Sequence, residues 1–284
     1  MRVAVLGLGD MGGPMASHVI AAGHEVTLYD PMAEALEGRV APGVRVADSP
    51  AAAAEGVEVV SVVVRDDAQS IESIDGPKGV LRGASPGTIV LLHATVAPAT
   101  VRRLGAACDE LGVRFVDAGI SGGRQGAEEG TLYVMCGGDP ADIEAARPVI
   151  DTFARHVVRF GPRGAGMAAK LARNLMHYQV WVATHDAMAL AEAAGLDMRA
   201  FEHLVRESKV ADLIGHQLAR DTTAPVEAAS DPARAAWIEK MVRLGWKDLE
   251  DAFALAEEVG TDVTMGVIAR HRFGPAMNLE LYPT

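Results

Sequence analysis

The stretch Val3-Ala4-Val5-Leu6-Gly7-Leu8-Gly9-Asp10-Met11-Gly12 decides the fold of the first half of the chain. A short apolar run, typical of a buried strand, stands directly before glycines in the spacing G-x-G-x-x-G, and a helical stretch follows. Gly7 allows a tight turn, Gly9 lets the backbone approach a pyrophosphate, and Gly12 lets the helix pack on the strand. The free N–H groups at the start of that helix face the anion, so the pattern predicts a dinucleotide-binding turn.

Asp30 strengthens this prediction. It ends the predicted strand Val26–Tyr29, about 20 residues after the glycines, where an acid accepts hydrogen bonds from the adenosine ribose hydroxyls. A carboxylate there repels the 2′-phosphate of NADP, and no arginine follows immediately to bind one. The sequence therefore favours NAD as cofactor over NADP. The alternative is that Asp30 only begins a turn before Pro31.

Short apolar runs alternate with alanine-rich helical stretches as far as Phe160. The predicted strands are Val3–Leu6, Val26–Tyr29, Val59–Val64, Ile89–Leu92, Arg114–Val116, Leu132–Met135 and Val157–Phe160. The predicted helices are Met15–Ala22, Met32–Glu37, Ala51–Ala54, Pro98–Leu111 and Asp142–Phe153. Most strand runs are continuously apolar, which is typical of strands covered on both faces in a parallel sheet. The fold class is therefore α/β, with a Rossmann-type doubly wound sheet over residues 1–161.

Residues 162–284 are expected to form an all-α domain. One long helix is predicted from Met167 to Gly195, because this stretch has neither proline nor a strong strand pattern. Further helices are predicted at Met198–Glu207, Val210–Leu218, Pro232–Leu244 and Asp248–Val259, with Gly195, Gly215 and Gly260 at the stops. Leu175–Ala183 and Ala187–Ala194 are apolar around much of the helix and need a covering surface. A homodimer or homotetramer is therefore expected.

The composition excludes several classes of protein. The 284 residues are 49% hydrophobic and 23% charged, as in an ordinary globular protein, which argues against disorder. A net charge of −12 disfavours nucleic acid and anionic membranes as partners. Cys108 and Cys136 form neither a C-x-x-C pair nor a Cys/His cluster, so neither a disulfide framework nor a structural metal site is expected. With no signal-peptide pattern after Met1, the prediction is a cytoplasmic protein.

Lys170 is the best candidate for proton transfer. It follows a glycine-rich entry into the long helix, and Asn174 lies at i+4 on the same face. A lysine that is partly desolvated near another cation or a helix N-terminus has a lowered pKa and becomes a usable general base. Taken alone, a helical lysine is more often a solvated surface residue. His93, His177 and His185 are interpreted as core or interface residues.

Four separated motifs resemble the β-hydroxyacid dehydrogenase family, the group that includes 3-hydroxyisobutyrate dehydrogenase. They are Gly7–Ala16, Asp117–Gly123, Gly161–Asn174 and Lys247–Leu249, and their order covers nearly all of the chain. The resemblance implies that Lys170 is the general acid/base and that Asn174 orients the substrate beside it. Arg173 and His177 stand where the decarboxylating 6-phosphogluconate branch has a histidine and a glutamate. Decarboxylation by that route is therefore not expected.

The resemblance also implies the binding residues. Ser121, Gly122 and Gly123 would bind the substrate carboxylate, and successive N–H groups in a glycine turn do form anion sites; a plain loop is the alternative. The cofactor contacts would come from Gly7, Leu8, Gly9, Asp10, Met11, Gly12, Asp30, Val64, Arg65, Thr95 and Lys247. Thr95 would serve the nicotinamide ribose or the substrate. Lys247 would close over both from the helical domain, unless it only pairs with Glu250 or Asp251 on its own helix.

Two departures from the family pattern concern the pocket. The loop after the fourth predicted strand usually reads Ser-Thr-Ile-(Ser or Asp)-Pro, and here Ala94 and Ala97 lack the polar groups of that pattern. Arg124 replaces a residue that is often small or apolar. It suggests a second anion contact for the substrate, against the simpler interpretation of a loop arginine paired with Glu128 or Glu129.

The predicted function is reversible, NAD-dependent oxidation of a small 3-hydroxy carboxylic acid, such as 3-hydroxyisobutyrate or serine, to its semialdehyde or keto acid. The alternatives within the enzyme class are an NADPH-dependent glyoxylate or succinic semialdehyde reductase, opposed by Asp30, and an imine reductase, opposed by Lys170. From another class, a non-catalytic dinucleotide sensor could share the fold, because fold alone does not establish function.

Overall fold

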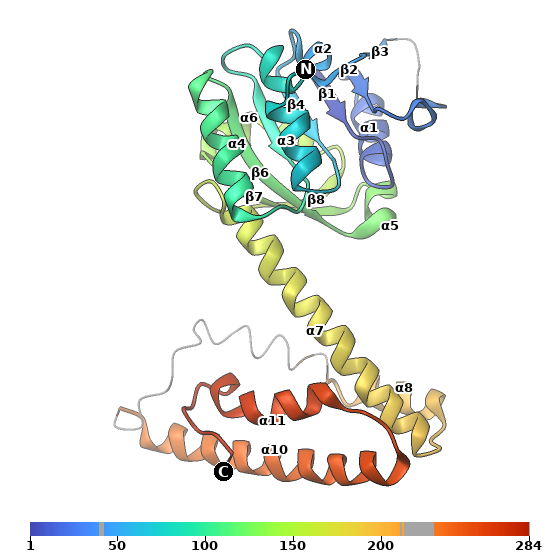
Figure 1. Cartoon of the computed structure of the whole chain (residues 1–284), viewed down its shortest axis with the longest axis vertical. Helices are drawn as coiled ribbons and strands as arrows, with labels where there is room; N and C mark the ends of the chain where they lie inside the picture. Colours follow the sequence, from blue (N-terminus) through green and yellow to red (C-terminus); the bar gives the residue numbers. More distant parts are fainter. Residues whose placement is uncertain (40–42, 211, 213–229, 284) are drawn as a thin grey trace. The chain divides into compact units, whose positions relative to one another are not determined.

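The computed structural model describes residues 1–39, 43–210, 212 and 230–283. The chain divides into two compact units, Met1–Leu175 and Met176–Thr284. The first unit is built on a sheet and the second is helical (Figure 1). The predicted boundary at residues 161 and 162 coincides with the end of the last strand, whereas the compact division falls inside the long helix. The reason is that the first turns of this helix pack on the sheet, where Met167 joins the core.

The first unit contains one eight-stranded sheet in the order β3-β2-β1-β4-β5-β6-β7-β8. Strands β1 to β8 span Arg2–Leu6, Glu25–Tyr29, Val44–Val46, Val59–Val62, Ile89–Leu92, Arg114–Ser121, Leu132–Gly137 and Ala154–Gly161. From β3 to β6 every neighbouring pair is parallel, β7 runs antiparallel to β6, and β8 is parallel to β7. The predicted Rossmann-type doubly wound fold is confirmed, with β7 as the departure from a purely parallel sheet.

Helices cover both faces of this sheet. They are α1 Gly12–Ala21, α2 Pro50–Ala54, α3 Asp67–Asp75, α4 Pro98–Glu110, α5 Gly123–Glu128 and α6 Pro140–Ile150, with the 3-10 helices η1 Ala33–Leu36 and η2 Val80–Arg82. Successive strand residues alternate between two core clusters, so that Val3 and Val5 pack with α1 and α6 while Ala4 and Leu6 pack with α2 and α4. The continuous apolar runs are thereby explained, because each strand is buried on both sides.

Five elements of the described residues were not predicted from the sequence. Strand β3 has only three residues, and α3 buries only Ser70 and Ile74, so neither leaves a strong hydrophobic pattern. Helix α5 begins at Gly123, inside what reads as a glycine loop. The other two are the 3-10 helix η2, which has only three residues, and helix α11 in the second unit. In addition, β6 extends to Ser121 rather than Val116, because its first half pairs with β5 and its second half with β7.

The second unit is helical over its described residues. Helix α7, Ala165–Ala193, crosses the division, and α8 Met198–Glu207, α10 Pro232–Val259 and α11 Thr264–Ala276 follow. The predicted helices 232–244 and 248–259 are one continuous helix. Gly245 lies within this helix, where α10 and α11 lie side by side (Figure 1). The absence of a side chain at Gly245 leaves space for the ring of Phe273. Gly260 ends α10 in the left-handed conformation, as expected.

The predicted helix Val210–Leu218 lies largely outside the described residues. Within the described part of the chain, no helix combines the length and apolar character that crossing a membrane requires.

Candidate active site

The glycine turn after β1 has the geometry that a dinucleotide needs. Gly7 has a φ of +87°, and a β-carbon on Gly7 or Gly12 would collide with backbone, at Val63 and Gly7 respectively. A β-carbon on Gly9 would meet nothing within 4 Å, so its backbone is open to an approaching group. Helix α1 begins after Met11 without a side-chain cap. Its first N–H groups are therefore suited to a pyrophosphate.

Asp30 holds this turn. Its Oδ2 accepts a hydrogen bond from the Leu8 N–H at 2.7 Å, and its Oδ1 accepts one from the Met32 N–H at 2.9 Å. Asp30 therefore stabilises the turn at Pro31, which was the alternative interpretation of the sequence, and it also hydrogen-bonds to the glycine loop. The carboxylate stands at the carboxyl end of β2, next to the loop after β1, where an adenosine ribose is bound in folds of this class.

Three other predicted cofactor residues follow the ends of β4 and β5. Val64 comes after β4 and lies near Gly7, where a β-carbon would be 3.4 Å from Val64 Cγ1. The Arg65 N–H donates to Gln69 Oε1 at 3.1 Å, and Thr95 lies exposed between β5 and α4. Asp10, in the glycine loop, is exposed as well.

Strand β6 ends at the predicted carboxylate site. Ser121 is its last residue, half-buried, and Gly122 and Gly123 follow with φ of +135° and +62°. Two successive residues with positive φ favour glycine at both positions. The exposed N–H groups of this turn lead into α5, which has no side-chain cap.

Lys170 lies against the same strand. Its Nζ donates a hydrogen bond to the Ile120 carbonyl at 2.6 Å, which places the ammonium one residue from Ser121. The residue is 9% exposed. Burial lowers the pKa of Lys170, and the neighbouring charge of Arg173 lowers it further. Asn174 is half-buried one turn later on α7, and its Oδ1 accepts from Arg173 Nη1 at 3.1 Å.

The strand order arranges these groups in a row. Strands β2, β1, β4, β5 and β6 are parallel neighbours in that order, so their carboxyl ends share one edge of the sheet. Asp30 lies at one end of the row, the glycine turn follows, and Ser121 with Lys170 lies at the other end. An extended dinucleotide matches such a row, with its adenosine at β2 and its reactive ring toward β6. The residues present therefore fit NAD.

Arg124 is engaged by carboxylates. Its Nε lies 2.7 Å from Glu128 Oε1, and its Nη1 lies 3.4 Å from Asp10 Oδ1. The pairing with Glu128 agrees with the simpler interpretation of the sequence. The contact with Asp10 was not predicted, and it joins the glycine loop to α5.

The start of α4 is hydrogen-bonded to a carboxylate of α3. The Ala97 N–H donates to Asp67 Oδ1 at 2.9 Å, and the Thr100 hydroxyl donates to the same oxygen. The Thr100 hydroxyl and the Ala97 N–H lower the pKa of Asp67. The Asp67 carboxylate thus joins α3 to the N-cap residue and the first turn of α4, a helix whose own N-cap residue forms no side-chain cap.

Lys247 belongs to α10 in the second unit, where its Nζ lies 3.1 Å from Asp248 Oδ1. Its role at the cofactor stays a prediction.

Three groups near the site were not singled out from the sequence. Asp117, within β6, is fully buried and accepts hydrogen bonds from the N–H groups of Gly164 and Met167, each at 2.7 Å. Gly119 lies beneath the stem of Lys170. The buried Ser61 hydroxyl lies 2.8 Å from His93 Nε2. The signal was present for Asp117, a charged residue inside an apolar strand, which requires partners.

His93 itself is a core residue, as expected. It is 2% exposed, and its Nδ1 lies 2.8 Å from the Ala118 carbonyl. Since a carbonyl only accepts, Nδ1 carries the proton and Nε2 accepts from Ser61. Burial lowers the pKa of His93 to about 4.

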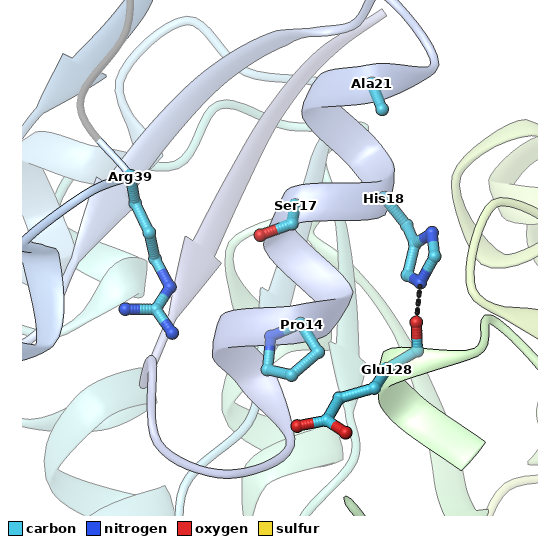
Figure 2. A pocket seen from close by; sticks show the side chains of 6 residues that line it. All are labelled: Pro14, Ser17, His18, Ala21, Arg39 and Glu128. Carbon is cyan, nitrogen blue, oxygen red and sulfur yellow. Dashed lines mark hydrogen bonds between the residues drawn. The ribbon is translucent and has the colours of Figure 1, made fainter. Parts of the chain in front are cut away.

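A separate hollow of about 450 Å³ lies beside α1, away from Lys170. Figure 2 shows its lining by Pro14, Ser17, His18, Ala21, Arg39 and Glu128. None of these belongs to the predicted site. Among these residues, His18 Nε2 lies 3.1 Å from the Glu128 carbonyl oxygen (Figure 2).

Comparison with known proteins identifies the class. Residues 2–161 match the family model described as the NAD binding domain of 6-phosphogluconate dehydrogenase. The chain is 33% identical to a 3-hydroxyisobutyrate dehydrogenase of Pseudomonas aeruginosa over 277 residues, covering 95% of this chain and 90% of that protein. It is 37% identical to an NAD-dependent L-serine dehydrogenase of the same species over 208 residues, covering 73% and 70%. A solved oxidoreductase structure from Mycobacterium avium matches with a TM-score of 0.83 and 32% identity, covering 98% of both chains.

Fold, glycine turn and family model together define an oxidoreductase that uses NAD. The chain belongs to the β-hydroxyacid dehydrogenase family, as its four motifs suggested.

Proposed function

We propose that this enzyme catalyses reversible oxidation of a small 3-hydroxy carboxylic acid to its semialdehyde or keto acid. The observation that carries the proposal is the Lys170 ammonium held at the Ile120 carbonyl, beside Ser121, at the end of the strand row. The proton-transfer group is thereby hydrogen-bonded to the residue that precedes the proposed anion-binding turn. A 3-hydroxy acid presents a hydroxyl and a carboxylate separated by two carbon–carbon bonds, which suits that spacing.

Each residue has a distinct role in the proposal. Ser121 and the N–H groups of Gly122 and Gly123 bind the substrate carboxylate. Lys170 accepts the proton of the C3 hydroxyl during oxidation and returns it during reduction. Asn174, one turn along the same helix, orients that hydroxyl. The lowered pKa of Lys170 increases the fraction of neutral amine near neutral pH, which a general base requires. When bound, NAD supplies the hydride acceptor.

The cofactor contacts are part of the proposal. The turn Gly7–Gly12 binds the pyrophosphate, Asp30 the adenosine ribose, Val64 and Arg65 the adenosine side, and Thr95 the nicotinamide ribose or the substrate. Lys247 reaches the cofactor from the helical domain. Asp30 favours NAD, because its carboxylate would repel a 2′-phosphate.

The substrate is 3-hydroxyisobutyrate, L-serine or a close analogue. The names of the Pseudomonas aeruginosa relatives support this class. One methylene in an apolar pocket changes binding by only about 1 to 3 kcal/mol, so related acids are expected to react as well. The engagement of Arg124 by Glu128 and Asp10 weakens the case for a second substrate anion.

We further propose a homodimer or homotetramer in the cytoplasm. Large apolar side chains on α7, including Tyr178, Trp181 and Val182, are exposed. Exposed apolar surface of this kind is typical of protein interfaces.

The test is the initial rate of NADH formation, followed by absorbance, with NAD and then NADP against a panel of 3-hydroxy acids. The reverse reaction is run with semialdehydes, glyoxylate and cyclic imines. Turnover of 3-hydroxy acids with NAD supports the proposal. Turnover confined to imines or glyoxylate with NADPH contradicts it in favour of the reductases, and tight NADH binding without any turnover favours a sensor.

A further inference from the structure

One face of β6 carries three residues that meet the start of α7. Side chains alternate along a strand, so Asp117, Gly119 and Ser121 share a face, while Ala118 and Ile120 point the other way. We propose that Asp117 is a positioning residue that fixes α7 on this face, and that Gly119 is the spacer that lets Lys170 lie there. The inference rests on the proposed function, in which Lys170 moves the proton.

Asp117 holds the first turn of α7 from outside the helix. Its Oδ1 accepts from the Gly164 N–H and its Oδ2 from the Met167 N–H, both at 2.7 Å. These N–H groups lie at the start of the helix, where the helix itself offers no acceptor. The side chain is fully buried. A buried carboxylate is costly unless hydrogen bonds compensate it, so its position is tightly coupled to that of the helix end.

Two glycines permit this close approach. A β-carbon on Gly137, in β7, would lie 2.6 Å from the Gly166 nitrogen and 2.7 Å from both Asp117 oxygens. A β-carbon on Gly166 would reach the backbone of β7 in turn. The helix start therefore rests on the sheet with backbone against backbone. Any larger residue at either position would push the helix away from Asp117.

Gly119 determines where the Lys170 side chain lies. A β-carbon on Gly119 would be 3.0 Å from Lys170 Cβ and 3.2 Å from its Cγ. The stem crosses the strand at this glycine, and the ammonium ends at the Ile120 carbonyl. Strand β6 thus fixes the helix at Asp117, the stem at Gly119, the ammonium at Ile120 and the carboxylate site at Ser121. A single strand therefore determines the distance between the Lys170 ammonium and the proposed carboxylate site at Ser121.

Gly119→Ala tests the spacer directly. Gly119 is not among the residues with positive φ, so alanine is tolerated by the backbone and acts only through its methyl group. Gly266→Ala is the matched control, since its β-carbon would come equally close, 3.0 Å, to the Phe253 ring in the second unit. Asp117→Asn tests the helix anchor, because the amide offers one acceptor and turns its N–H₂ toward a backbone N–H. Asp139→Asn, at the cap of α6, is its control.

The first readout needs no turnover. Lys170 is acylated with a small amine-reactive reagent at a series of pH values, and the extent of acylation is measured by peptide mass spectrometry. Because only the neutral amine reacts, the pH dependence of the labelling reports the pKa of Lys170. Gly119→Ala and Asp117→Asn should shift the labelling curve to higher pH by releasing the amine toward solvent, whereas the two controls should follow the wild type. Thermal unfolding is measured for all four variants.

The second readout is steady-state kinetics with the best acid of the panel. Gly119→Ala and Asp117→Asn should lower kcat at least about tenfold, since misplacing a general base forfeits part of its usual effect. The KM for NAD should stay within about twofold, and the rise of kcat with pH should move to higher pH. Should Asp117→Asn fail to fold, Gly119→Ala alone decides.

The outcomes separate the two proposals. Unchanged labelling and kcat in folded Gly119→Ala overturn the inference that β6 determines the position of Lys170, even if Lys170 proves essential. Conversely, a shifted labelling curve in an enzyme that turns over no hydroxy acid supports the positioning of Lys170 and overturns the proposed function.

Discussion

His93 should make the stability of the sheet depend on pH. The imidazole is enclosed by Ser61, the Ala118 carbonyl and the ring of Phe153. Burial lowers its pKa from 6.5 to about 4, so the folded chain binds the proton less readily than the unfolded chain. Between these values the unfolded state carries more protons, and stability therefore falls as the pH is lowered from 6.5 toward 4.

The magnitude follows from the two pKa values. By proton linkage, the free energy of unfolding should fall by about 2 kcal/mol between about pH 7.5 and about pH 5, and by about 3 kcal/mol at lower pH. His93→Gln keeps a donor and an acceptor at this site but cannot titrate. The variant should therefore lose about 2 kcal/mol less than the wild type over the same interval, whatever its stability at neutral pH. His156→Gln, which removes an exposed imidazole from β8, is the control.

The assay has to report on the first unit. All three tryptophans, Trp181, Trp237 and Trp246, lie in the second unit, so their fluorescence does not follow the sheet. Denaturant-dependent oxidation of the buried Met15 and Met135 by peroxide, measured by mass spectrometry, does so. Parallel pH dependence in wild type and His93→Gln would refute the assignment of a neutral, buried His93.

Three further predictions concern single residues. Ser121→Ala should raise the KM for the acid about tenfold while leaving the Kd of NADH, measured by fluorescence, unchanged; weakened NADH binding would contradict its assignment to the substrate. Asp30→Ala should lower the ratio of kcat/KM for NAD to that for NADP, and an unchanged ratio would restrict Asp30 to its turn. Asp67→Ala should lower the free energy of unfolding by about 1 kcal/mol through loss of the hydrogen bonds from the Ala97 N–H and the Thr100 hydroxyl. The hydrogen bonds that lower the pKa of Asp67 contribute stability that is lost as the pH falls through that lowered pKa. The free energies of unfolding of wild type and variant should therefore converge in acid. A difference that stays constant with pH would contradict this.

Local signals predicted much of the first unit. The glycine turn, Asp30 and the apolar runs depend on residues close in sequence, and their geometry follows from backbone sterics and strand burial. The second unit was less predictable. Two helices, Pro232–Leu244 and Asp248–Val259, were predicted where α10 is continuous, and the ring of Phe273, on the following helix, occupies the space beside Gly245.

In the candidate site, too, local features were predicted and contacts between distant residues were not. Lys170 and Ser121 were identified through family motifs, yet their adjacency depends on the pairing of β6 with both β5 and β7, which no local pattern reveals. Asp117 stands out as a charged residue in an apolar stretch, but its role could not be predicted because its partners at Gly164 and Met167 are distant in sequence. Likewise, Asp67 binds the start of α4 from α3, a helix that the sequence did not predict because its apolar pattern is weak.

The central claim is that Lys170 moves the proton at the substrate oxygen. The most direct measurement compares wild type and Lys170→Ala in initial rate with NAD and the best 3-hydroxy acid, alongside NADH binding by fluorescence. We expect kcat to fall about 10²- to 10⁴-fold while the Kd of NADH changes less than about threefold. A variant that binds NADH normally and retains more than about a tenth of the wild-type kcat would contradict the account.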